Sequence, residues 1–175
     1  MQTFSPLTSE LVCIARPLTA TFGIKKKRGI FNTLDFIPAG EIIGKKHQVR
    51  TVTINQSPQL PDGDYSFIDT YCADPNCDCR KTMIQVMHNE KIVSIINYGW
   101  ESAAFYENWW GDDSIDIPMP KMHGASIDIT SPDLVDRNGI LSLFNALLND
   151  IWVAKFKHHY REFKVAISKE PSRSN

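Results

Sequence analysis

The chain has 175 residues, enough for one domain with a substantial core, and its apolar fraction of 42% and charged fraction of 22% are typical of globular proteins. A formal net charge of −1 excludes attraction of the whole molecule to nucleic acid or to a membrane surface. The start of the chain has no signal-peptide pattern, and no stretch approaches the ~18 apolar residues that cross a bilayer. We therefore expect a cytoplasmic protein without a membrane segment.

The first third of the chain reads as short strands and turns. Residues 11–16 (LVCIAR) and 48–54 (QVRTVTI) are rich in β-branched side chains and predict strands. Between them, residues 25–46 contain short apolar pieces punctuated by glycine and proline, which predicts hairpins.

A turn-rich stretch with two prolines and a glycine, SPQLPDGD at 57–64, is the best candidate for a boundary. On this basis the chain divides into three segments: a β-rich N-terminal segment 1–60, an α+β domain 61–167 and a disordered tail 168–175.

Strand patterns dominate again after this boundary. Residues 65–72 (YSFIDTYC) alternate like a strand that runs directly into the cysteines, and 81–100 hold two β-rich runs joined around His88–Lys91, which predicts a hairpin. Residues 101–113 (ESAAFYENWWGDD) space aromatic residues four apart and predict a short helix. Residues 124–130 (GASIDIT) predict a further strand.

The last part of the chain has the clearest helical pattern. Ser131, Pro132 and Asp133 together resemble a helix start, and Asn138-Gly139 predicts a break or kink. Apolar residues then recur at steps of three and four, at Ile140, Phe144, Leu147 and Ile151 and again at Trp152, Phe156, His159 and Phe163. The predicted fold class is α+β, with a small antiparallel sheet, a long C-terminal amphipathic helix and a zinc knuckle.

Three of the four cysteines fall within eight positions, Cys72, Cys77 and Cys79, in the stretch YCADPNCDCR. A tetrahedral zinc with Zn–S bonds of ~2.3 Å needs its thiolates about 3.5–4 Å apart, which a tight loop can deliver. Pro75-Asn76 and an Asx turn at Asp74 would supply that loop. A Cys77–Cys79 disulfide would be strained and would leave a third thiol over, and the C-x-x-C spacing of redox sites is absent. The pattern therefore predicts a Zn²⁺ site.

The fourth ligand has to come from elsewhere in the chain. Cys13 lies in a strand-like segment, His88 at a hairpin tip that is expected to face solvent, and His123 on a loop. His159 lies on the apolar face of the predicted helix, where an inward histidine needs a partner for its ring nitrogens. We predict His159 as the fourth ligand, with His123 second and Cys13 as a further alternative.

Two parts of the sequence resemble segments of other protein groups. The segments YSFIDTYC, CDCR, NYGWES and HHYREFK, between about residues 65 and 164, resemble those of an uncharacterised group of bacterial proteins. That likeness implies a zinc-type site at the three cysteines, supports His159 and implies no activity. Residues 25–44 resemble the opening hairpin of SET-domain lysine methyltransferases, whose Asn-His-Ser/Cys cofactor motif is missing here.

The function predicted from these patterns is zinc binding in a structural role, within a binding module. The alternative is a zinc-dependent enzyme, either a hydrolase or a SET-like methyltransferase, but thiolate ligands make zinc a weak activator of water, which favours a role without catalysis. Aromatic residues beside acids predict a surface for a protein or basic peptide rather than nucleic acid, formed by Trp100, Tyr106, Trp109 and Trp110.

Overall fold

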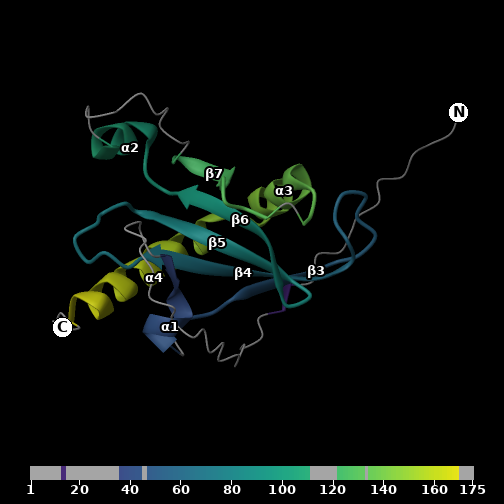
Figure 1. The fold of residues 1–175 in the computed structure, drawn as a ribbon, viewed down its shortest axis with the longest axis horizontal. Helices are drawn as coiled ribbons and strands as arrows, with labels where there is room; N and C mark the ends of the chain where they lie inside the picture. Colours follow the sequence, from purple (N-terminus) through teal and green to yellow (C-terminus); the bar gives the residue numbers. More distant parts are fainter. Residues whose placement is uncertain (1–12, 15–35, 45–46, 111–121, 133, 170–175) are drawn as a thin grey trace, which may run out of the picture.

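The computed structural model describes residues 13–14, 36–44, 47–110, 122–132 and 134–169. The strands are β1 (Cys13–Ile14), β2 (Phe36–Pro38), β3 (Arg50–Ile54), β4 (Gly63–Cys72), β5 (Lys81–His88), β6 (Lys91–Gly99) and β7 (Gly124–Ile127). The helices are α1 (Ala39–Ile43), α2 (Ala103–Trp110), α3 (Arg137–Leu147) and α4 (Asp150–Lys169). The strands form one antiparallel sheet in the order β1-β3-β4-β5-β6-β7, with β2 also paired to β4 (Figure 1). The predicted α+β class is confirmed.

Strand β4 is paired along both of its edges. On one edge β5 runs beside it, and on the other β3 pairs with its first half and β2 with its last three residues. Residues from both sides of the turn-rich stretch 57–64 thus share one sheet, with Arg50 opposite Phe67 and Phe36 opposite Cys72. The predicted boundary near residue 60 falls in the connection between β3 and β4, which are neighbouring strands of this sheet.

The predicted β5–β6 hairpin is present and turns through Asn89 and Glu90. Both residues have positive φ angles, 48° and 61°, which is the backbone that a tight two-residue hairpin turn requires. The expectation that His88 faces solvent is wrong. Its ring stacks on Tyr65 with centroids 4.4 Å apart, and its Nδ1 lies 3.1 Å from the carbonyl oxygen of Asp64.

The core lies between one face of the sheet and the helices α3 and α4, which run along that face in Figure 1. Alternate residues of each strand point to this face because the side-chain period of a strand is two. The core residues contributed by β4, β5 and β6 are Tyr65, Phe67, Ile84, Val86, Val93, Ile96 and Tyr98, and those from the helices are Ile140, Phe144, Leu147, Trp152 and Phe156.

The C-terminal helical segment begins later than predicted and consists of two helices. Asp136 caps α3 by accepting a hydrogen bond from the Gly139 amide, so Asn138-Gly139 lies in the first turn and does not break the helix. Ser131 is buried away from any helix and accepts a bond from the Ile95 amide at 2.9 Å. Asn149 starts α4 by accepting from the Trp152 amide at 2.9 Å.

One other expectation, for the first part of the chain, needs correction. Residues 39–43, placed within predicted hairpins, form the short helix α1. Of the predicted strand 11–16, only 13–14 are described, and most of the SET-like stretch 25–44 lies outside the described residues. At the other end, α4 continues to Lys169, and 170–175 are not described.

Among the described residues, no helix is both long enough and apolar enough to cross a membrane.

Gly99, at the end of β6, gives a test of the fold. A Cβ atom at this position would lie 2.0 Å from the Met122 carbonyl oxygen and 2.6 Å from the Tyr106 hydroxyl. We expect Gly99→Ala to lower the free energy of unfolding by about 1–3 kcal/mol, the usual cost of overpacking. Chemical denaturation measures the change, and Ala104→Ser, which adds one atom at an exposed position of α2, is the control. Equal stability of the two variants would contradict this packing.

Candidate metal centre

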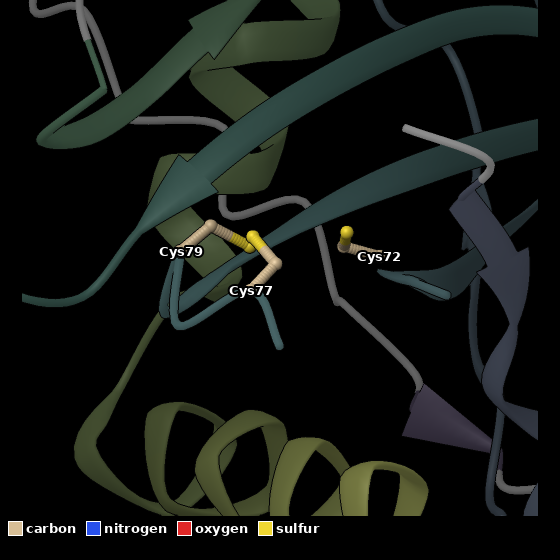
Figure 2. Close-up of side chains that lie close together, drawn as sticks. All are labelled: Cys72, Cys77 and Cys79. Carbon is tan, nitrogen blue, oxygen red and sulfur yellow. The ribbon is translucent and has the colours of Figure 1, made fainter. Parts of the chain in front are cut away.

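The three clustered cysteines meet at one end of β4. Cys72 is the last residue of that strand, and Cys77 and Cys79 lie in the loop that leads to β5 (Figure 2). Their three sulfur atoms lie within 4.8 Å of one another, and all three thiols are free. Zinc holds thiolates about 3.5–4 Å apart, so only small side-chain movements separate this arrangement from a coordinating one.

The loop owes its shape to the turn that the sequence predicted. The Asp74 carboxylate accepts from the Asn76 amide at 2.9 Å, which closes an Asx turn, and the Asp74 carbonyl accepts from the Cys77 amide at 3.2 Å. Arg80 then adopts a left-handed backbone with φ of 44° before β5 begins. These turns bring Cys77 and Cys79 back to the end of β4.

Helix α4 holds the loop from one side. The Lys164 ammonium donates to the backbone carbonyl oxygens of Cys72, at 3.0 Å, and Asp74, at 2.7 Å. One turn earlier, the Tyr160 hydroxyl donates toward the Cys77 carbonyl at 3.4 Å and lies 3.3 Å from the Asp78 carboxylate. The position of the cysteines therefore depends on the docking of α4.

Helix α2 supports the other end of the loop. The Tyr106 hydroxyl donates to the Arg80 carbonyl at 2.6 Å, and burial raises the pKa of Tyr106 to about 12, so it remains a donor at neutral pH. The Arg80 guanidinium pairs with Asp78 at 2.9 Å and lies over the ring of Phe105. A tyrosine predicted to face a partner thus fixes the backbone next to Cys79.

The three thiols shift one another's pKa values. A hydrogen bond from Cys79 lowers the pKa of Cys72 to about 6, against the opposing effect of burial, and Lys164 contributes to the lowering. The hydrogen bond to Cys72, together with burial, raises the pKa of Cys79, and burial followed by the charge of Cys72 raises that of Cys77. The hydrogen bond thus favours a thiolate at Cys72, while Cys77 and Cys79 are favoured as thiols. A divalent cation would favour the thiolate form of all three.

The structure places three of the four residues considered as fourth ligands, and of these His88 stacks on Tyr65 as described above. His159 is not part of the cysteine group: it belongs to a second cluster, in which its Nδ1 is bonded to the Asp69 carboxylate at 2.9 Å. The assignment of His159 to the cysteines needs correction because its inward ring has this other partner. His123 is exposed, and its Nδ1 lies 2.5 Å from the Glu101 carbonyl oxygen. The side chain of Cys13 lies outside the described residues.

Only some of the residues of the predicted aromatic surface are accessible to solvent. Tyr106 is fully buried and therefore cannot contact a partner. Trp100 is half-buried and packs edge-on against Tyr160, with ring centroids 5.4 Å apart. Trp109 is half-buried, and nothing is described for the side chain of Trp110.

The second cluster consists of His47, Asp69 and His159, and no motif or spacing in the sequence joins these three residues. His47 lies in a loop that carried no motif. Asp69 could have been recognised as buried from the sequence, because it occupies a core-facing position between Phe67 and Tyr71 in an alternating strand. A carboxylate at such a position needs buried partners, and the two histidines supply them.

Neither family models, curated proteins nor solved structures match this chain, so its function has to be inferred from its own residues.

Lys164 provides a test of how α4 holds the cysteine loop. We expect Lys164→Met to lower the free energy of unfolding by about 1–2 kcal/mol, because two carbonyl oxygens lose a charged donor. Amide hydrogen exchange of residues 72–80 should rise at the same time, as measured by mass spectrometry. Lys157→Met, elsewhere on the same helix, is the matched control. If both variants protect the loop equally, Lys164 does not hold it.

Proposed function

We propose that this protein binds one zinc ion through Cys72, Cys77 and Cys79, and that the ion has a structural role. The observation that supports this proposal is the convergence of three free thiols within 4.8 Å, in a loop fixed by hydrogen bonds from α4. The ion would lock the end of β4 to the start of β5. It would also stabilise the docking of α4.

Zinc is favoured by the donor set. Thiolates are soft ligands that select zinc, copper(I) or iron–sulfur clusters, and Zn²⁺ accepts a tetrahedral arrangement without any preference from its d electrons. Reduced cysteines that act as ligands are also typical of the cytoplasm, which is where we place the protein. A fourth ligand would come from solvent or from a residue outside the cysteine group.

A structural role is favoured over catalysis by the same donors. Three thiolates transfer negative charge to zinc, so a water molecule bound at the fourth position would keep its proton more firmly than in a histidine-ligated site. The nearby carboxylate of Asp78 is paired with Arg80 at 2.9 Å, an interaction that would compete with its use as a base.

The protein would then act as a binding module. The support for this part is helix α2, which carries the half-buried Trp109, a residue type that is enriched at binding hot spots, and the exposed acid Glu107 on another side of the helix. Without a basic face, such a helix suits a protein or basic peptide better than nucleic acid.

The zinc site is tested by elemental analysis of the purified protein. We expect about one equivalent of zinc per chain to depend on the cysteines, so that Cys77→Ser contains one equivalent less than the wild type. Ala73→Ser, in the same loop, keeps all three thiols and should retain the zinc. A full zinc content in Cys77→Ser would refute the site.

Removal of the metal tests its structural role. The large core in the described residues forms without the cysteines, so a chelator should lower the melting temperature while most far-UV circular dichroism remains. Hydrogen exchange should rise mainly at residues 70–80 and 155–163, where the loop meets α4. The chelator should have no further effect on the loop in Cys77→Ser. An unchanged melting temperature in the wild type would point to chemistry or sensing instead.

A further inference from the structure

A second set of ligand atoms lies in the core, away from the thiols. His47 precedes β3, Asp69 lies in β4 and His159 lies in α4, so three separate elements meet here. Their side chains are only 6%, 4% and 7% exposed. One ligand atom from each lies within 4.8 Å of the others. Residues 22 and 90 positions from Asp69 meet only because the fold brings them together.

The Asp69 carboxylate is the centre of this set. Its Oδ1 is bonded to His47 Nε2, and its Oδ2 lies 2.9 Å from His159 Nδ1. Burial alone would raise the pKa of Asp69, but the hydrogen bonds from His159 and His47 outweigh burial and hold that pKa below its ordinary value. Both carboxylate oxygens are therefore engaged by imidazole nitrogens.

Tyr71 supplies the outer contact that carboxylate ligands of metals usually have. Its hydroxyl lies 2.7 Å from Asp69 Oδ2 and 2.9 Å from the carbonyl oxygen of Phe156. A carboxylate and a carbonyl oxygen can only accept, so the hydroxyl is the donor in this group. The tyrosine ring is fixed in turn by Tyr160 and Phe163, with centroids 5.8 and 5.6 Å away.

The backbone also accommodates the His47 ring. A Cβ atom on Gly40 would lie 3.1 Å from His47 Nδ1, closer than ordinary contact, so glycine in α1 leaves room for the imidazole. The ring of His47 lies 5.1 Å from that of His159, centroid to centroid. The two imidazoles thus contact the same carboxylate from two different parts of the fold, the loop before β3 and helix α4.

We propose that His47, Asp69 and His159 form a second metal site, distinct from the thiols, which binds a first-row divalent cation such as Zn²⁺ through two imidazole nitrogens and one carboxylate oxygen. This donor set is borderline to hard and suits zinc, cobalt, iron(II) or manganese rather than copper(I). The cation would replace the protons that now join the imidazoles to Asp69. Stability alone does not account for the cluster, because apolar residues of similar volume often stabilise a core as well as buried charges do.

Cobalt(II) is the probe for this test, because thiolate ligands give it charge-transfer bands that nitrogen and oxygen ligands do not. In the full chain carrying Cys77→Ser and Cys79→Ser, we expect one equivalent of Co²⁺ to bind with d–d absorption and without thiolate bands. Adding His159→Gln should weaken this binding at least about tenfold, whereas His158→Gln, at the exposed neighbouring position, should not. Tyr71→Phe should weaken it about tenfold through loss of the hydroxyl alone.

The outcomes separate the two sites. A cysteine variant that is folded by circular dichroism yet binds no Co²⁺ would show that the cluster is a hydrogen-bond network held by protons, and would overturn the proposal. If that variant does not fold, the wild type is titrated: a second equivalent without thiolate bands, lost in His47→Gln, supports the site, and a single thiolate-type equivalent overturns it. Absence of thiolate bands in the wild type would refute the cysteine site alone.

Discussion

The contact between helix α4 and strand β4 determines the geometry of both candidate sites. At its centre, the buried Asp69 carboxylate of β4 bonds to His159 of α4, and the Tyr71 hydroxyl joins the same carboxylate to the backbone of the helix. An ionised carboxylate in a core is tolerated only when its oxygens are paired, since removing one partner leaves an uncompensated charge. The helix therefore cannot shift along the strand without breaking these bonds. The register of α4 is fixed by polar contacts as well as by apolar packing.

The sheet was largely predictable because its strands carry local signals. In β5 and β6, buried and less buried residues alternate over most of their length, and the two residues between the strands form a tight turn. Helix starts were less predictable, because the residue types that cap helices also form hydrogen bonds elsewhere in the fold. Ser131 has the pattern of a cap, but its hydroxyl serves the Ile95 amide within the sheet, and Asp136 caps α3 instead.

The thiol cluster was predictable for the same reason that the second cluster was not. Cys72, Cys77 and Cys79 are close in sequence, so a single loop with an Asx turn brings them together. His47, Asp69 and His159 come from three elements, and only the pairing of strands and the docking of α4 bring them within reach. Periodicity correctly placed His159 on the buried face of the helix, but it contains no information about which strand residue that face meets. The sequence therefore did not reveal that the Asp69 carboxylate lies opposite His159.

Helix periodicity explains how one element serves three environments. Trp152 and Phe156 pack in the main core, His159 meets Asp69, and Tyr160 and Lys164 contact the cysteine loop. Steps of three, four and one residue keep all of these side chains within a single broad stripe, because 3.6 residues complete a turn. The later turns are also held by apolar packing, because Tyr160 and Phe163 form a second buried cluster with Ala39 and Tyr71. Tyr160 belongs to that cluster and also contacts the cysteine loop, so an ion bound to the thiols would stabilise the same part of the helix that this second cluster holds.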